Sequence, residues 1–247
     1  MKVAALIPAR TGSKGIPGKN FKEFCGKPLY EWTLDEALAS NVFDKIIFSS
    51  DGGFHGPSHT TQQGKCTIVY DNNRLKEMSN DEAGLDDLLC YYKNRHEEID
   101  LWCLLQPTSP LRLAEDIRQA RAMMDIKGGP YSKDGDIKYE SLVSVSPNPV
   151  MAWIKDAVGI PGDPDTPQPI ATYHYQDRPN RQERSDWFLE NGAIYFTRKY
   201  ILDYFKVRLH GSIAMYEMPY ERSFEIDESI DWFICEKLIE RRQDGVG

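Results

Sequence analysis

The chain has 247 residues, of which 40% are hydrophobic, a size and composition that fit one α/β domain with room for a small appendage. Its net charge of −8 argues against bulk attraction to nucleic acid or to an anionic membrane. The absence of a long apolar run, of a signal-peptide pattern and of any Cys-x-x-Cys pair predicts a cytoplasmic protein with reduced thiols and no membrane segment.

The first predicted element is a buried strand at residues 3–7, which runs directly into a glycine-rich, cationic loop. Residues 8–20 of this loop read P-A-R-T-G-S-K-G-I-P-G-K-N. Glycines let backbone N–H groups approach phosphate oxygens, and the long cations neutralise phosphate charge. The spacing matches neither the dinucleotide nor the ATPase fingerprint. We expect a polyphosphate site here; a solvated basic turn is the alternative.

Strand-like and helix-like segments then alternate along the chain, which predicts βαβ units, a mostly parallel sheet and ligands at the carboxyl ends of its strands. The predicted strands are residues 45–49, 66–70, 100–105, 141–145, 191–196 and 214–218. The predicted helices are residues 28–39, one that begins at 79–82, 113–124, 198–205 and 231–241. We expect residues 55–65 to be irregular and residues 128–136 to form a surface loop.

The pattern breaks between Pro147 and Phe188, where prolines are frequent and no long periodic segment occurs. Compact domains rarely contain forty structureless residues without a purpose. We therefore interpret residues 1–247 as one domain in which residues 147–188 form an inserted arm. The arm covers the site or reaches a second subunit; a disordered linker is the alternative.

Five segments of the chain resemble the acylneuraminate cytidylyltransferase (CMP-sialic acid synthetase) family. The loop at residues 9–20 contains every fixed letter of the family's A-R-x-x-S-K-G-x-P-x-K-N pattern. The other four are S-S-D-G-G at 49–53, L-L-Q-P-T-S-P-L-R at 104–112, N-G-A-I-Y at 191–195 and F-E-I-D-E-S-I-D at 224–231. Their order and spacing make a chance match improbable. The resemblance implies a Rossmann-like, doubly wound sheet with a dimerisation arm.

The resemblance also implies how CTP is bound. Arg10, Ser13, Lys14 and Lys19 would hold the phosphates, and Asn20 would bond the ribose. Fixed cations offset the charge that builds up during attack on the α-phosphate. Arg74 and Asp81 would lie near the cytosine. Glu82 follows Asp81 where the family commonly has threonine.

Glu225 and Asp227 resemble the family's metal-binding pair. They are two residues apart in what we interpret as a strand end, so both side chains share a face. Two hard oxygens there suit Mg²⁺ or Mn²⁺. The family usually has aspartate in place of Glu225. In the alternative, the segment is the acidic start of the last helix, with Asp227 as its cap.

The sugar side follows from the same resemblance. Arg181 lies where the family places an arginine that pairs with the sugar carboxylate, and a bidentate guanidinium suits that role. Gln106 would bond sugar hydroxyls, and Tyr195 would pack on the sugar or fill the core. Leu189 replaces a usual arginine, which favours a deoxygenated sugar such as legionaminic or pseudaminic acid. A solvated, charged arm is the alternative for Arg181.

The resemblance implies a homodimeric enzyme that joins CMP from CTP to the anomeric hydroxyl of an acidic nine-carbon sugar and releases pyrophosphate. Arg10, Lys14 and Asp227 would be its catalytic residues. A CMP-Kdo synthetase is the nearest rival, but that relative typically reads Q-G-D-E-P where residues 106–110 read Q-P-T-S-P. A catalytically silent nucleotide-binding subunit is the rival from another class.

Overall fold

The computed structural model describes residues 1–13, 15–52, 57–79, 84–127, 139–148, 150–157, 168–174, 176–184 and 187–245. Two compact units are distinguished, one of residues 1–145 and 190–247 and the other of residues 146–189. The predicted site residues Lys14 and Asp81 and the predicted loop at residues 128–136 lie outside the described residues.

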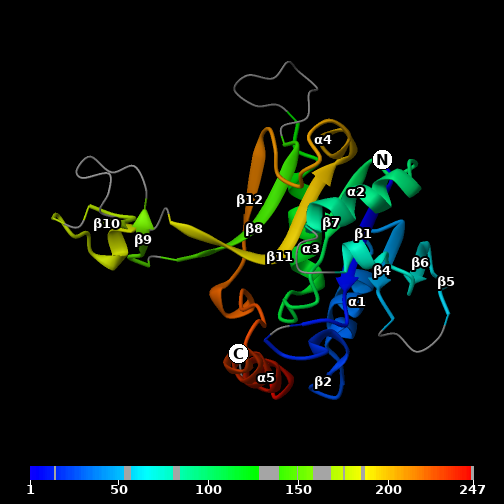
Figure 1. The fold of residues 1–247 in the computed structure, drawn as a ribbon, viewed down its shortest axis with the longest axis horizontal. Helices are drawn as coiled ribbons and strands as arrows, with labels where there is room; N and C mark the ends of the chain where they lie inside the picture. Colours follow the sequence, from blue (N-terminus) through cyan, green and yellow to red (C-terminus); the bar gives the residue numbers. More distant parts are fainter. Residues whose placement is uncertain are drawn as a thin grey trace. The chain divides into compact units, whose positions relative to one another are not determined.

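The larger unit is built on a central sheet whose strand order is β12-β8-β11-β7-β1-β4-β6-β5 (Figure 1). β1 pairs in parallel with both β4 and β7, and β4 with β6, whereas β11 is antiparallel to β7. The mostly parallel α/β fold predicted from the sequence is confirmed. Its strands are β1 (Val3–Ala9), β4 (Lys45–Ser50), β5 (His59–Gln63), β6 (Cys66–Asp71), β7 (Leu101–Leu104), β8 (Ser141–Pro147), β11 (Phe188–Arg198) and β12 (Ile213–Glu217).

Helices cover both faces of this sheet. Tyr30 of α1 packs on Phe48 of β4, with ring centroids 4.6 Å apart, while Tyr92 of α2 donates to the hydroxyl of the next strand residue, Ser49. Successive strand residues point to opposite faces, so α1 and α2 lie on opposite sides of the sheet. The helices are α1 (Leu29–Ser40), α2 (Leu85–Arg95), α3 (Ala114–Met123), α4 (Lys199–Tyr204) and α5 (Ser229–Gln243). Short 3-10 helices cover Lys19–Phe21, Lys76–Met78 and Tyr220–Arg222.

The centre of the sheet is buried on both sides, as a parallel sheet between helices requires. Residues of β1 from Ala4 to Ile7 and all four residues of β7 have almost no exposed surface. The polar residues of the motif loops follow these buried strands at their carboxyl ends. The motif loops therefore lie along the same side of the sheet. None of the helices in the described residues has both the length and the apolarity to cross a membrane.

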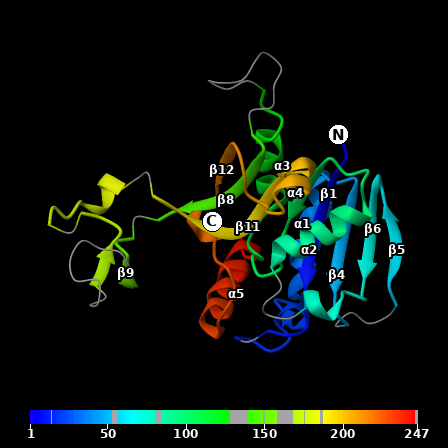
Figure 2. The same cartoon turned by 45° about the horizontal axis from the view of Figure 1, so that its top comes forward.

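The prediction for residues 55–65 is wrong in part, because His59–Gln63 forms the edge strand β5 (Figure 2). It runs antiparallel to β6 through a turn in which Gly64 has a φ of 59°. All five of its residues are exposed, so the strand lacks the apolar alternation that identifies a half-buried strand. The β-branched Thr60 and Thr61 before a glycine turn are the signal that could have found it.

The smaller unit contains a two-stranded antiparallel sheet of β9 (Trp153–Ala157) and β10 (Gln168–Ala171) and a 3-10 helix at Arg181–Arg184. Trp153 packs edge-on against Tyr173, with centroids 6.0 Å apart. The N–H of Asn148 donates to the carbonyl of Trp187 over 2.9 Å, which closes the ends of the unit. The predicted arm falls within this unit. In the larger unit a short hairpin joins β2 (Glu23–Phe24) to β3 (Lys27–Pro28).

Candidate active site

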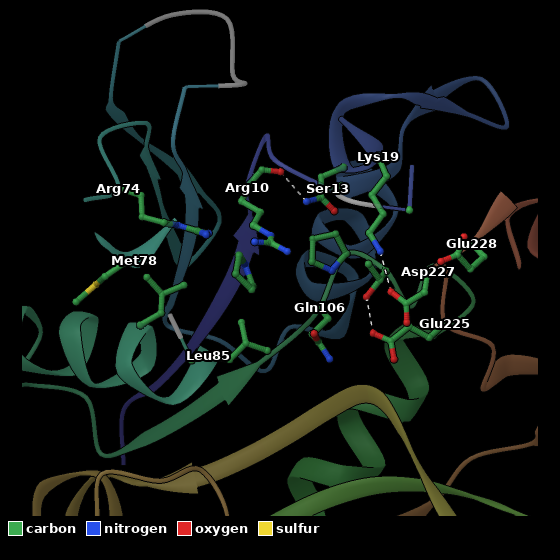
Figure 3. A pocket seen from close by; sticks show the side chains of 17 residues that line it. Arg10, Ser13, Lys19, Arg74, Met78, Leu85, Gln106, Glu225, Asp227 and Glu228 are labelled. Carbon is green, nitrogen blue, oxygen red and sulfur yellow. Dashed lines mark hydrogen bonds and ion pairs between the residues drawn. The ribbon is translucent and has the colours of Figure 1, made fainter. Parts of the chain in front are cut away.

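A cavity of about 440 Å³ lies at the carboxyl ends of β1 and β7 in the larger unit (Figure 3). Loops from the start, the middle and the end of the chain meet around it. The predicted site residues that line it are Arg10, Ser13, Lys19, Asn20, Arg74, Gln106, Glu225 and Asp227. The sheet thus brings most of the predicted nucleotide and metal residues to one place.

The cationic loop after β1 is held at both of its ends. The N–H of Thr11 donates to Oδ1 of Asp51, which follows β4, over 2.7 Å. At the other end, Lys19 Nζ donates to the carbonyl of Ile226 at 2.6 Å and to Oδ1 of Asp227 at 2.9 Å. Lys19 therefore neutralises charge on residues 225–228, which we call the acidic segment, and it also contributes positive charge to the cavity.

Gly15 lets this loop touch the acidic segment. A Cβ atom at Gly15 would overlap the main-chain oxygen of Asp227 and approach Glu228 Oε1 to 3.2 Å. By contrast, a Cβ at Gly12 would meet nothing within 4 Å. Close approach, rather than a special φ, is what requires glycine at position 15.

Two buried polar atoms in the cavity wall lack a partner among the described residues, namely Ser13 Oγ and Asn20 Oδ1. The amide nitrogen of Asn20 is used, because it donates to the carbonyl of Arg10 over 2.9 Å. An unpaired buried acceptor costs about 1–3 kcal/mol. A bound ligand that donates to Asn20 Oδ1 and shares a hydrogen bond with Ser13 would remove that cost.

The acidic segment is an extended loop, so the predicted strand end at Glu225 and Asp227 is wrong. Among the described residues no strand pairs with it; instead it is fixed to the loop after β7. Thr108 Oγ1 donates to Glu225 Oε1 over 2.7 Å, and the N–H of Ile226 donates to the carbonyl of Thr108 over 2.7 Å. Both carboxylates still reach the same cavity.

Capping of the last helix leaves Asp227 free for the cavity. The N-cap of α5 is Glu228, and Asp231 Oδ2 accepts from the N–H groups of Asp227 and Glu228 at 3.1 and 2.8 Å. The side chain of Asp227 is 70% exposed and contacts Lys19. The alternative in which Asp227 caps the helix is therefore wrong.

The residues present fit a divalent cation for which the protein supplies only some of the ligands. Glu225 and Asp227 offer hard oxygen donors to one cavity, and Mg²⁺ is typically held by one or two carboxylates plus substrate phosphates and water. Burial, the largest effect, raises the pKa of Glu225, and the charge of Asp227 adds to this. No group of three or more His, Cys, Asp and Glu side chains in the described residues forms a closed metal cage.

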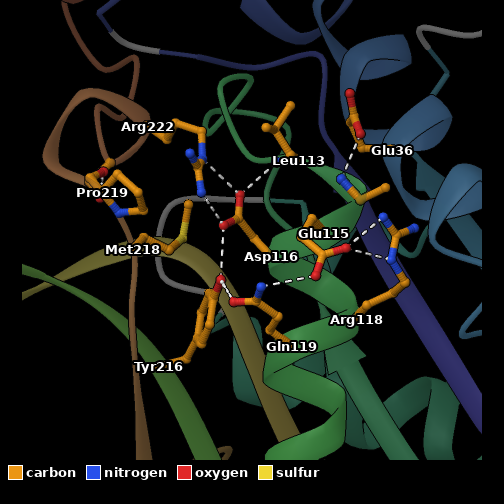
Figure 4. A network of polar contacts seen from close by, with 12 residues as sticks. Glu36, Leu113, Glu115, Asp116, Arg118, Gln119, Tyr216, Met218, Pro219 and Arg222 are labelled. Atoms are coloured by element: carbon orange, nitrogen blue, oxygen red, sulfur yellow. Dashed lines mark hydrogen bonds and ion pairs between the residues drawn. The ribbon is translucent and has the colours of Figure 1, made fainter.

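An ion pair between the buried Asp116 and Arg222 holds the turn that precedes the acidic segment. Asp116, with no exposed surface, accepts from the N–H of Leu113 at 2.8 Å, the hydroxyl of Tyr216 at 2.9 Å, and Nε and Nη2 of Arg222 at 3.1 and 2.7 Å (Figure 4). Every lone pair of the carboxylate is directed at a donor, as a buried charge requires. Arg222 thereby fixes the turn that precedes Glu225 against α3.

Arg74 lines the side of the cavity across from the acidic segment, near Met78 (Figure 3). It is buried, and its Nε and Nη2 donate to the hydroxyl and the carbonyl of Ser49 at 3.0 and 2.7 Å. Burial lowers its pKa, with Tyr92 and Asp51 opposing the effect. Arg74 therefore shapes the cavity while its charge is held against the end of β4.

The predicted sugar residues are less closely grouped. Gln106 lines the cavity and donates to the carbonyl of Gly192 over 3.0 Å. Tyr195 does not line it; the ring is buried, and its hydroxyl donates to Glu190 over 2.9 Å. For Arg181 the structure describes the backbone, in a 3-10 helix of the smaller unit, and not the side chain. These assignments stay predictions.

Sequence reasoning missed two residues that build the site. Thr108 lies inside the L-L-Q-P-T-S-P-L-R motif, whose sequence gives no sign of the contact that Thr108 makes. Its hydroxyl donates a hydrogen bond to Glu225. Gly192 has a φ of 66°, and a Cβ there would lie 2.7 Å from Glu225 Oε2 and 2.8 Å from Gln106 Nε2. Two motif residues in contact across the fold leave no local pattern in a single sequence.

Comparison with known proteins places these motifs in a family. The model of the family described as "Cytidylyltransferase" matches residues 4–217. N-acylneuraminate cytidylyltransferase A of Danio rerio is 31% identical over 242 residues, which cover 97% of this chain and 51% of that protein. CMP-N,N'-diacetyllegionaminic acid synthase of Legionella pneumophila is 29% identical over 258 residues, covering 100% of both.

The chain can also be compared with its relatives in length and with solved structures in fold. The chain spans about half the length of the Danio rerio protein and of several other N-acylneuraminate cytidylyltransferases that it matches. Among solved structures, a CMP:2-keto-3-deoxy-manno-octonic acid synthetase complexed with CTP superimposes with a TM-score of 0.60 at 17% identity, covering 98% of this chain and 100% of that one. That likeness shows the fold.

Proposed function

Because the chain belongs to the cytidylyltransferase family, we propose that it joins the CMP part of CTP to the anomeric hydroxyl of a nonulosonic acid and releases pyrophosphate. The observation that carries the proposal is one cavity in which the cationic loop after β1 faces two carboxylates. The relatives named for N-acylneuraminate and N,N'-diacetyllegionaminic acid support the choice of sugar. The proposed enzyme acts in the cytoplasm.

In the proposed reaction the anomeric oxygen forms a bond to the α-phosphorus, and the bond from that phosphorus to the bridging oxygen of pyrophosphate breaks. The hydroxyl proton leaves to solvent or to a phosphate oxygen. Arg10 and Lys14 offset the negative charge on the transferred group, and Lys19 holds the phosphates close to Asp227. Fixed charges in a site closed to water stabilise such a transition state without reorganisation.

The two buried polar atoms without a partner give the nucleotide its position. Asn20 Oδ1 accepts from a ribose hydroxyl, and the hydroxyl of Ser13 donates to a phosphate oxygen. Arg74, together with Asp81, borders the cytosine. Alignment of the two reactants supplies much of the rate enhancement in reactions of this type.

Glu225 and Asp227 would hold Mg²⁺ or Mn²⁺, which when bound would polarise phosphate oxygens and lower the pKa of a bound hydroxyl. Thr108 orients Glu225, and Lys19 shares Asp227. The longer reach of glutamate makes Glu225 the weaker ligand of the two.

For the sugar, we propose that Arg181 pairs with the carboxylate and that Gln106 bonds hydroxyl groups. Leu189 makes the neighbouring surface less polar than arginine would. A legionaminic or pseudaminic acid is therefore the favoured substrate, ahead of sialic acid itself.

We also propose that the enzyme is a homodimer in which the arm packs on a second copy. Val150, Trp153, Ile154 and Trp187 of the smaller unit are 40–55% exposed. Large apolar side chains left in water favour an interface. Sedimentation at micromolar concentration should give a dimer, and a monomer at every concentration would overturn this part of the proposal.

A pyrophosphate-release assay with CTP tests the function. The sugars are N-acetylneuraminic, N,N'-diacetyllegionaminic and pseudaminic acids, with Kdo as the rival substrate. Turnover with nine-carbon acids and little with Kdo supports the proposal. Preference for Kdo favours the rival enzyme, and CTP binding without turnover favours a silent subunit.

A further inference from the structure

The larger unit contains a second cavity, of about 590 Å³, beside the C-terminal half of α5. Among the described residues, none lines both this cavity and the cavity of the candidate active site. Its walls come from the loop after β7, the 3-10 helix at Tyr220–Arg222, α5 and the turn after α5. The lining residues are Leu111, Leu113, Glu221, Arg222, Leu238, Arg241, Arg242 and Gly245. Sites for small molecules are typically cavities of this size.

One part of the wall of the second cavity is apolar. Leu111 is buried and belongs to an apolar cluster with Trp232 and Ile239 of α5. Leu238 is half-buried and packs against the same cluster, and Leu113 is half-buried as well. Apolar surface in a cavity gains free energy when the apolar part of a ligand displaces water from it. A ligand that uses this wall therefore needs an apolar body.

The rest of the lining is cationic, although the whole chain has a net charge of −8. Arg222 is already paired with the buried Asp116, to which its Nε and Nη2 donate at 3.1 and 2.7 Å (Figure 4). Arg241 and Arg242 bring two further positive charges, against one negative charge on Glu221. Guanidinium groups bind carboxylates and phosphates through strong, charge-assisted hydrogen bonds. The lining therefore favours a ligand with an anionic group.

Arg241 and Arg242 lie in the last turn of α5, where cations also stabilise a helix by opposing the negative end of its dipole. That role needs no cavity and no leucines beside the arginines. The combination of an apolar wall with two guanidinium groups is what indicates a ligand that is apolar at one end and anionic at the other.

We propose that the second cavity is a binding site for a small organic anion with an apolar body and one carboxylate, phosphate or sulfonate group. The leucines contact the apolar body, and Arg241 and Arg242 pair with the anionic group. The ligand also lies beside Leu113 and Arg222, the two lining residues that donate hydrogen bonds to Asp116. It therefore binds next to the turn that precedes the acidic segment.

The test uses two fluorescent probes that share one apolar body. They are 1-anilinonaphthalene-8-sulfonate, which is an anion, and N-phenyl-1-naphthylamine, which lacks the sulfonate. Titration of the full chain should show saturable binding of the sulfonate probe. Arg241→Gln combined with Arg242→Gln should weaken that binding about tenfold, because charged hydrogen bonds are lost, and should leave the affinity for the uncharged probe unchanged. Leu238→Gln should weaken the binding of both probes.

The matched control combines Lys22→Gln with Lys237→Gln, which also removes two positive charges. Each lysine lies over an aromatic ring of α5, that of Trp232 or that of Phe233, and neither lines the second cavity. Its affinity for both probes should equal that of wild type, and thermal melting verifies that each variant is folded.

Three results would overturn the proposal. Wild type would fail to bind the sulfonate probe, or the double arginine variant would bind it as tightly as wild type does, which would leave the two arginines with the helix end alone. An equal loss in the lysine control would show that net charge, and not this cavity, explains the binding. None of these measurements uses CTP or a sugar, so the site and the proposed function are tested independently.

Discussion

The end of the cavity that we propose binds the nucleotide and the end that we propose binds the sugar are built in different ways. Around the loop after β1, segments distant in sequence bond one another directly: the N–H of Thr11 donates to Asp51, and Lys19 Nζ donates to Asp227. At the end proposed to bind the sugar, the side chain of Gln106 donates to the carbonyl of Gly192 on β11.

The difference indicates that the two ends of the cavity have different roles. The loop that we propose binds phosphate follows the buried strand β1, which fixes its position. Loops carried on a rigid scaffold are where recognition changes most readily. Substitutions at the nucleotide end should therefore lower turnover, and substitutions at the sugar end should change selectivity.

The largest effect is expected for Asp227→Asn, together with removal of divalent metal by EDTA. Each should lower turnover about 10³-fold, near 4 kcal/mol, because the charge balance of the phosphates is lost. Glu225→Gln should lose less. Glu240→Gln, exposed on α5 and paired with Lys237, is the control and should keep wild-type turnover. Full activity in EDTA would contradict a metal-dependent reaction.

Lys14→Ala is expected to lower turnover by roughly 10²–10³ at saturating CTP, about 3–4 kcal/mol of transition-state stabilisation. Lys22→Ala removes a nearby cation that lies over the ring of Trp232 at 4.7 Å and does not line the cavity. That control should be close to wild type. Near wild-type turnover of the Lys14 variant would show that the loop does not stabilise the reaction.

Gly15→Ala tests the contact between the loop and the acidic segment. The new Cβ would overlap the main-chain oxygen of Asp227, so the two segments must separate. A displacement of about 1 Å costs roughly 10²-fold in rate. Gly12→Ala, where the Cβ meets nothing within 4 Å, should have little effect. Equal rates for the two variants would mean that the contact is not needed.

Arg181→Ala tests the role that we propose for Arg181 in binding the sugar. Loss of a charged, hydrogen-bonded pair costs at least about 2 kcal/mol, so the sugar KM should rise roughly 30-fold. The KM for CTP should stay the same. Arg178→Ala is the control, because its Nε contacts Met151 Sδ at 3.0 Å within the smaller unit. An unchanged sugar KM in a folded Arg181 variant would mean that Arg181 belongs to a solvated, charged arm.

The fold and the family were predictable because their signals are local. The apolar run at residues 3–7 identified β1, and the five motifs identified the family confirmed by the match over residues 4–217. What was not predictable depends on partners distant in sequence. Thr108 contacts Glu225 and Gly192 approaches Gln106, and neither pairing has a periodicity that one sequence can show.

The errors have the same physical origin. β5 was missed because an edge strand exposed on both faces needs no apolar residues. Glu225 and Asp227 were placed on a strand because extended loops and strands share an alternating pattern, and only a hydrogen-bonded neighbour distinguishes them.

The contact of Gly15 with Asp227 has a consequence for synthesis of the chain. The loop after β1 is synthesised before the segment around Asp227, and each of them forms one wall of the cavity. A ribosome-bound chain can fold β1, β4 and β7 early, since domains fold as their N-terminal parts emerge. It cannot close the cavity until the segment around Asp227 has left the ribosome, so a truncated product carries the loop without the acids that complete it.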